Sequence, residues 1–255
     1  MLERQQASNA DTTDHSAAYV PRIGCLPCDV SCDDSVESLF SERLPSCLSD
    51  MAADQRHESK YRQRLDALIH SVAYAPPDAM KDGSLLTTSR KSFGVAHEIS
   101  SYSLILMARH AFPMMSASNS VEDNESFEES STPSASITAL SYLGANRAVP
   151  NYNVMGPAKA SLESVVRGLA LELGPPPHQI RVNAVSAGPI NTMAAKGIRG
   201  FTDMRVDSED RSMLRRNVTA DEVADAVVFL SGATGITGQT LYVDGGYSSV
   251  AGPVI

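Results

Sequence analysis

Short apolar runs alternate with longer segments of helical periodicity along this chain. The apolar runs that predict strands lie at residues 20–30, 65–76, 135–143, 180–190 and 238–246. The run at 65–76 is nearly continuous, which is typical of a parallel strand buried on both faces. Because strands and helices alternate, the pattern predicts an α/β fold with a doubly wound, Rossmann-like parallel sheet.

Helices are predicted between these strands, with recognisable starts. One opens with acids at Asp33, another at a capping Thr88 or Ser89, a third at Pro157, and the last behind Thr219. Right-handed crossovers bring the carboxyl ends of all the strands to one edge of the sheet, where ligands bind. Candidate catalytic residues are therefore sought just after strands.

Three segments do not fit this alternation. Residues 1–19 are polar and are predicted to be disordered, and residues 41–64 are interpreted as a surface extension of mixed character. Residues 116–135 form a serine- and acid-rich low-complexity insert without packing potential. A solvated loop is expected there.

Composition and charge exclude several classes of protein. The chain has 255 residues, of which 42% are hydrophobic, as expected for one large globular domain. A formal net charge of −9 argues against a nucleic-acid partner. No apolar run reaches the roughly 18 residues of a membrane span, and the N-terminus resembles no secretory signal. A cytoplasmic protein is expected, or a plastid one if the source is eukaryotic.

The four cysteines lie close together in the sequence. They are Cys25, Cys28, Cys32 and Cys47, and the CLPC spacing is compatible with a redox or zinc pair. No histidine lies nearby at zinc-finger spacing. The cysteines are therefore interpreted as small packing residues, and no metal site is predicted.

The stretch PNYNVMGPAK holds Tyr152 and Lys159, seven residues apart. Seven helical residues turn through about 700°, so both side chains would share one helix face. A nearby ammonium is expected to lower the pKa of the tyrosine, which makes Tyr152 a candidate donor to a carbonyl oxygen. Pro157 favours the first turn of a helix, which would leave Tyr152 on an entry turn.

Several segments around this pair resemble a single family. They are HSVAYAP (70–76), SYLGANRAVPNYNVMGPAK (141–159), RVNAVSAGPINTMAAKGIRGF (181–201), RRNVTADEVA (215–224) and GITGQTLYVDGGY (235–247). These segments look like the enoyl-acyl-carrier-protein reductases of bacterial type-II fatty-acid synthesis, in the short-chain dehydrogenase/reductase superfamily. The resemblance runs from about Cys25 to Gly246. The Y-x6-K spacing separates this family from the ketoacyl reductases, which use Y-x3-K.

The resemblance implies a reaction and the side chains that carry it. A trans-2-enoyl-acyl-carrier-protein would be reduced to acyl-carrier-protein by hydride from NADH, with NADPH not excluded. Tyr152 would hydrogen-bond the thioester carbonyl, Lys159 would bind the nicotinamide ribose, and Tyr142 would be a second active-site tyrosine. A homotetramer is implied if the sheet is intact.

The same resemblance assigns the cofactor site. Asp29 would accept from the adenine amine and Val30 would pack beside it. Ser71, Val72 and Ala73 would lie under the ribose and nicotinamide, and Ala75 would line the substrate pocket. The segment that closes over the nicotinamide amide and pyrophosphate would be Ile190, Asn191, Thr192, Met193 and Ala194, with the Thr192 hydroxyl on phosphate.

Each assignment has a plainer alternative. Asp29 could cap the following helix, and Ser71 and Thr192 could be turn residues that satisfy backbone groups. Tyr142 could be a packed aromatic residue. His70 is interpreted as a core histidine rather than a base.

The family's first strand, glycine-rich turn and helix have no counterpart ahead of Cys25. Residues 20–255 are therefore expected to form a single truncated dinucleotide-binding reductase domain that lacks its first β-α-β segment. The alternative function is a non-catalytic paralogue or fragment that binds no cofactor and acts, if at all, as an oligomer partner.

Overall fold

The computed structural model describes residues 23–53, 64–80, 85–116, 134–192, 195 and 198–251. Its strands form one parallel sheet in the order β1-β2-β3-β4. The strands are β1 (Ala67–His70), β2 (Ser136–Tyr142), β3 (Arg181–Ala187) and β4 (Thr240–Val243). Each of these four strands lies within one of the predicted apolar runs. The predicted parallel sheet is confirmed.

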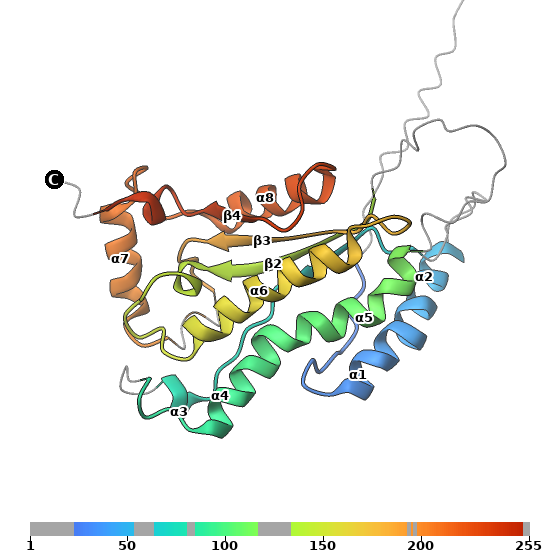
Figure 1. The fold of residues 1–255 in the computed structure, drawn as a ribbon, viewed down its shortest axis with the longest axis horizontal. Helices are drawn as coiled ribbons and strands as arrows, with labels where there is room; N and C mark the ends of the chain where they lie inside the picture. The colour runs from blue at the N-terminus through green and yellow to red at the C-terminus, as the bar shows by residue number, and fades with distance from the viewer. Residues whose placement is uncertain are drawn as a thin grey trace, which may run out of the picture.

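Helices cover both faces of this sheet (Figure 1). On one face α5 and α6 pack against the strands, with α1 against α5, whereas α8 packs on the other face against β2, β3 and β4. The predicted doubly wound α/β fold is confirmed for the described residues. The α-helices are α1 (Asp33–Ser38), α2 (Leu44–Ala53), α3 (Pro77–Met80), α4 (Arg90–His97), α5 (Ser103–Ser116), α6 (Met155–Leu173), α7 (Phe201–Arg211) and α8 (Ala220–Gly232).

Single turns of other helix types join several of these helices. The π-helical turn η1 (Leu39–Arg43) connects α1 to α2, and η3 (Glu98–Tyr102) connects α4 to α5. Short 3₁₀ turns follow β2 at η5 (Leu143–Ala145) and β4 at η7 (Tyr247–Ser249).

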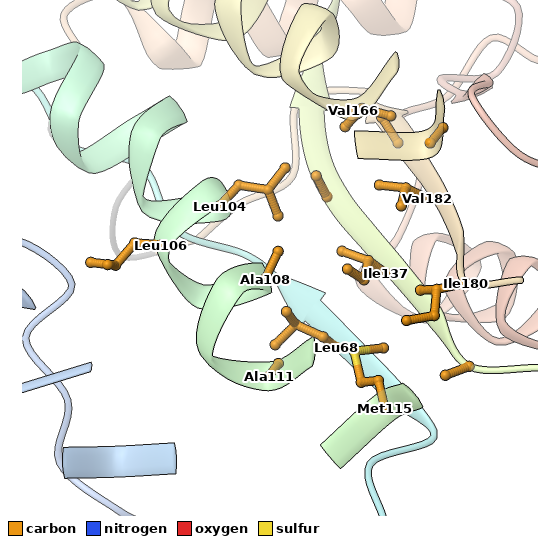
Figure 2. Close-up of a cluster of buried hydrophobic side chains, with 14 of the residues drawn as sticks. Leu68, Leu104, Leu106, Ala108, Ala111, Met115, Ile137, Val166, Ile180 and Val182 are labelled. Atoms are coloured by element: carbon orange, nitrogen blue, oxygen red, sulfur yellow. The ribbon is translucent and has the colours of Figure 1, made fainter. Parts of the chain in front are cut away.

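The main hydrophobic core lies between the sheet and the helices α5 and α6 (Figure 2). Leu104 and Ala108 of α5 point toward Ile137 of β2, and Val166 of α6 lies over Val182 of β3. β3 is buried along its whole length. This core fixes where the carboxyl ends of the strands meet, and the candidate site lies at that edge.

The expected burial of β1 on both faces is wrong. Leu68 and His70 are buried toward α5, but Ile69 between them is 48% exposed. The reason is that β1 is the edge strand among the described residues and α8 covers the opposite face only at β2, β3 and β4. Alternate residues of a strand face opposite sides, so only one side of β1 is covered.

The strand expected at residues 20–30 is not formed in its described part, residues 23–30. Within the described residues, no strand lies beside the free edge of β1 to pair with it. The backbone bonds locally instead: the Cys32 N–H donates to the Asp29 oxygen at 3.2 Å.

This loop also changes the interpretation of the cysteines. Cys25 and Cys32 are exposed, so the packing role is wrong for these two, whereas Cys28 packs against the core. All four are free thiols. In the described ranges, no three His, Cys, Asp or Glu side chains gather as a metal site requires.

Two helices differ from the prediction. Residues 41–53 belong to η1 and α2 rather than to a surface extension, because Leu39 and Leu44 pack against the main core. Helix α7 was not predicted at all. Its sequence FTDMRVDSEDR is mostly polar and carries no continuous apolar stripe.

The predicted helix starts are confirmed at two capping residues. The Ser89 hydroxyl accepts from the Ser92 N–H at 3.0 Å. Thr219 and Glu222 form a reciprocal capping box at the start of α8.

Two of the predicted irregular segments lie mainly outside the described residues. These are residues 1–19, and all of the insert at 116–135 except its ends. Ser116 closes α5 and Ala135 is buried just before β2, so neither residue belongs to a solvated loop. In the part of the chain that the structure describes, no helix has the length and apolar composition of a membrane span.

Candidate active site

Two tyrosine rings meet at the carboxyl end of β2. Tyr142 is the last residue of that strand, and Tyr152 lies in the loop that leads to α6. Their ring centroids are 4.8 Å apart with an interplanar angle of 60°, a spacing at which aromatic pairs attract. The structure therefore brings together the two tyrosines that the sequence singled out.

Tyr152 sits in a tight turn between two asparagines. Asn151 and Asn153 have φ of 62° and 32°, a region that asparagine tolerates better than most residues. The Asn153 amide anchors the turn by donating to the Ala79 oxygen at 3.2 Å. Helix α6 begins only at Met155, so Tyr152 is on the entry turn that Pro157 indicated and shares no regular helix face with Lys159.

Gly144 in η5 provides the space for the Tyr152 ring. A Cβ at this position would lie 2.3 Å from Cδ1 of Tyr152, far inside van der Waals contact. The Tyr152 ring can therefore pack here only because residue 144 is a glycine.

Lys159 is buried on α6 beside the end of β2. It is 5% exposed, and its ammonium donates to the Leu140 oxygen at 2.7 Å. An ammonium has three donors, so two remain for a ligand. Burial lowers the pKa of Lys159 to about 8, and the charge of Glu163 acts in the opposite direction.

The expected direction of the Tyr152 pKa shift is wrong. Burial raises the pKa of Tyr152, and the neighbouring Tyr142 raises it further. Lys159 directs its ammonium to the Leu140 oxygen, so desolvation dominates over any attraction between a phenolate and this cation. The phenol stays protonated at neutral pH. It donates to no other described residue and is free to donate to a ligand.

Tyr142 is covered by the unpredicted helix α7. Its hydroxyl contacts the Met204 sulfur at 3.1 Å, and burial raises its pKa, helped by the nearby Tyr247 and the Asp207 carboxylate. The sequence offered no signal for Met204 and Asp207 because the helix that carries them lacks an apolar stripe. Tyr142 is thus a packed aromatic residue that also borders the site.

His70 behaves as the core histidine expected from the sequence. It is 1% exposed, and its Nε2 lies 2.7 Å from the Ser103 hydroxyl. Because that hydroxyl donates to the Ile99 oxygen at 2.6 Å, the ring N–H donates to it. Burial lowers the pKa of His70 to about 4, and the Lys159 charge adds to the effect. His70 is therefore neutral at pH 7.

This buried histidine predicts an acid-sensitive fold. The folded-state pKa of about 4 is below the ordinary 6.5, so the unfolded chain binds the extra proton between these values and stability falls as pH falls through them. The loss is on the order of 3 kcal/mol over the whole interval, of which about 2 kcal/mol falls between pH 7 and pH 5. Urea unfolding at about pH 7 and about pH 5 should show a smaller difference in His70→Gln than in the parent chain. An equal difference would contradict this role.

The cofactor residues predicted after β1 and β3 lie at the same edge as the tyrosines. Ser71 and Ala73 are exposed and Val72 is half-buried. After β3, the Thr192 hydroxyl accepts from the Ala195 N–H at 3.1 Å, which is the turn role considered as an alternative. Its own proton remains available to a phosphate oxygen. Ile190 is half-buried and Asn191 exposed, whereas Met193 and Ala194 lie outside the described residues.

The predicted adenine-contacting residues lie in the loop before α1. One Asp29 oxygen accepts from both the N–H and the hydroxyl of Ser31, at 2.9 and 2.7 Å, and these bonds lower its pKa. Asp29 is not the helix cap, because Cys32 holds that position. Its second oxygen is free to accept from a ligand amine, and Val30 beside it is half-buried.

Ala75 approaches the turn that carries Tyr152. It packs in a small cluster with Val154, two residues beyond Tyr152. The Ser100 hydroxyl holds the preceding residue from both sides, accepting from the Tyr74 N–H at 2.9 Å and donating to its carbonyl at 3.0 Å. The loop after β1 is thereby fixed beside the site, as a pocket wall requires.

A cavity of about 610 Å³ lies further along the sheet edge, at the end of β4. Leu143 and Asn146 reach it from the segment after β2, Tyr242 reaches it from β4, and Asp244 reaches it from just after β4. Tyr142, Tyr152 and Lys159 do not line it. The donors and acceptors that fit a dinucleotide are instead the spare Lys159 protons, the Thr192 proton and the free Asp29 oxygen.

A parallel sheet wound on both faces, with polar groups at its carboxyl edge, defines the class of Rossmann-like dinucleotide-binding proteins. The comparisons with known proteins specify the family. The family described as Enoyl-(Acyl carrier protein) reductase matches residues 1–248. A protein of Neisseria meningitidis named enoyl-[acyl-carrier-protein] reductase [NADH] FabI is 43% identical over 223 residues, which cover 87% of this chain and 73% of the relative. The Bacillus cereus protein of the same name is 39% identical over 248 residues, which cover 96% of this chain and 82% of that relative.

Solved structures agree with this result. The enoyl-[acyl-carrier-protein] reductase (NADH) of Aquifex aeolicus superposes with a TM-score of 0.72 at 36% identity, covering 88% of this chain and 76% of that one. The Anaplasma phagocytophilum reductase, solved in complex with NAD, has a TM-score of 0.70 at 35% identity, and the match covers 90% of this chain and 74% of that one. The chain belongs to the enoyl-acyl-carrier-protein reductase family.

Proposed function

We propose that this chain reduces trans-2-enoyl-acyl-carrier-protein to acyl-carrier-protein with NADH, as a step of fatty-acid biosynthesis. The observation that carries the proposal is the group at the end of β2: the Tyr142 and Tyr152 rings 4.8 Å apart, and the buried Lys159 bonded to the Leu140 oxygen. Relatives named enoyl-[acyl-carrier-protein] reductase [NADH] support both the substrate and the cofactor.

Each residue of the site has a separate role in the proposed reaction. NADH, when bound, would supply the hydride for the β-carbon of the enoyl thioester, and a proton taken from solvent at the α-carbon would complete the reduction. Tyr152 stays a protonated phenol and donates to the thioester oxygen, which stabilises the negative charge that develops there. Lys159 directs its spare protons at the cofactor's ribose diol. Tyr142 packs on Tyr152 and restricts its ring.

The remaining sites belong to the same proposal. Ser71, Val72 and Ala73 would lie under the nicotinamide and its ribose, and Ala75 would form a wall of the substrate pocket. Asp29 and Val30 would hold the adenine, and the segment Ile190–Ala194 would close over the pyrophosphate.

Assembly is the second part of the proposal. The chain would form a homotetramer, and the support is exposed apolar surface on α8 and β4. Val228 and Phe229 of α8 are 71% and 56% exposed, and Leu241 of β4 is 37% exposed. Exposed apolar groups on neighbouring elements are typical of subunit contacts.

A cytoplasmic location, expected from the sequence, stays a prediction.

The non-catalytic alternative finds no support in the comparisons, since the matched relatives are named as reductases. The deciding experiment is to mix the purified chain with NADH and crotonyl thioesters and to follow the absorbance of the reduced nicotinamide. Oxidation of NADH that depends on the thioester is the expected result. Absence of turnover together with absence of NADH binding would contradict the proposal.

A further inference from the structure

Three consecutive residues of β2 reach the active-site elements in three different ways. The Leu140 oxygen accepts from Lys159, and the Tyr142 ring packs on Tyr152. Between them, the Ser141 hydroxyl donates to a carboxylate oxygen of Glu163 at 2.6 Å. Neither Ser141 nor Glu163 has a role in the chemistry described above.

Glu163 lies one helical turn after Lys159 on α6. Residues four apart on a helix are neighbours on one face, so the two charged side chains lie on the same side of α6. Glu163 is only 8% exposed, and a carboxylate is rarely buried without a partner. In the described residues it forms no direct ion pair with Lys159, and the Ser141 hydroxyl is the group that holds it.

We propose that Glu163, held by Ser141, is a positioning residue that keeps the buried Lys159 protonated for binding the ribose of the reduced cofactor. This inference rests on the proposed function, because it deepens the role of Lys159 in it. Glu163 touches neither cofactor nor substrate and acts through Lys159.

The charges around Lys159 support this role. Burial drives its pKa down to about 8, and the Glu163 charge is the influence that raises it. The other titratable groups close to Lys159 are neutral at pH 7: His70, whose pKa is about 4, and the phenols Tyr142 and Tyr152, whose pKa values are raised. Elsewhere on the elements packed against α6, the charged or titratable side chains are exposed (Arg90, Lys91, Glu98, Tyr102 and Arg109) or half-buried (His97 and His110). Arg181 binds the Leu230, Ser231 and Ala233 oxygens.

The variant Glu163→Gln separates charge from packing. Its amide oxygen can still accept from Ser141, but the negative charge is gone. The pKa of Lys159 should fall by about one unit, and with it the pH at which NADH binding weakens on the alkaline side. With a midpoint moved from about pH 8 to about pH 7, NADH should bind about fivefold more weakly at pH 8.

Two readouts test this. Nicotinamide fluorescence gives the NADH dissociation constant across the pH range, and the NMR titration of the Lys159 side chain gives its pKa in the cofactor-free protein. Glu163→Asp should restore most of the shift. Glu172→Gln is the matched control, because Glu172 is exposed near the end of the same helix, and it should change neither readout.

The outcomes are distinguishable. A Lys159 pKa in Glu163→Gln equal to that of the parent chain, with only a lower melting temperature, would overturn the inference and leave Glu163 structural. Should that variant fail to fold, the double variant Ser141→Ala, Glu163→Leu removes the charge and its buried partner together, and an unchanged Lys159 pKa there would also overturn the inference. A parent chain that binds no NADH would contradict the proposed function, while the NMR titration would still decide the coupling between Glu163 and Lys159.

Discussion

Tyr152→Phe should lower kcat about a hundredfold or more while changing the NADH dissociation constant by no more than about twofold. The substitution removes only the hydroxyl that would donate to the developing enolate oxygen. The ring, its contact with Tyr142 and its fit over Gly144 all remain. An interaction made mainly in the transition state lowers kcat and kcat/KM together when it is lost.

The folded protein should tolerate this change well. The Tyr152 hydroxyl donates to no described residue, so its removal leaves no buried partner unsatisfied, and the melting temperature should stay close to that of the parent chain. Initial rates of NADH oxidation with a crotonyl thioester measure the effect. Tyr102→Phe, at an exposed position on η3, is the control and should keep the parent rate. A full rate in Tyr152→Phe would remove this residue from the chemistry.

Local signals in the sequence predicted much of the fold. The caps at Ser89 and Thr219 depend on side chains within three residues of the helix start, and both were found where expected. The runs of β2 and β3 were located correctly because β3 is buried along its length and β2 along most of its length, and both are therefore apolar. Features that depend on residues distant in the sequence were harder to predict. Ile69 reads as part of a buried run, yet its exposure depends on which helices cover β1.

In the candidate site, too, features set by local sequence could be predicted, and features set by burial could not. The spacing of Tyr152 and Lys159 indicated that the two residues act together, but it gave the wrong direction for the tyrosine pKa. Spacing along the chain carries no information on how deeply a phenol is buried, and burial is the larger effect here. Nothing in the sequence singles out Glu163, because a glutamate in an amphipathic helix usually faces solvent. Its burial depends on Ser141, which approaches from β2.

Lys159→Met should weaken NADH binding by about tenfold to a hundredfold, because a hydrogen bond from a charged donor contributes roughly 1.5–3 kcal/mol. Methionine keeps much of the buried stem, so the loss reports on the ammonium. The variant should also lose the alkaline weakening of NADH binding near pH 8, since the titrating group is gone. Nicotinamide fluorescence measures both effects. Lys91→Met, on the exposed surface of α4, is the matched control and should retain parental binding at each pH.

The same variant tests the cost of burying this charge. The folded-state pKa of Lys159, about 8, lies below its ordinary 10.5, so between these values the unfolded chain binds more protons and the stability of the parent chain should rise with pH. The rise attributable to Lys159 is on the order of 3 kcal/mol over the whole interval, of which about 2 kcal/mol falls between pH 7.5 and pH 9.5. Urea unfolding of the parent chain and of Lys159→Met at about pH 7.5 and about pH 9.5 isolates it, because every other titrating group is shared. An identical pH dependence in the two proteins would mean that Lys159 keeps its ordinary pKa, and its proton could then not control NADH binding near pH 8.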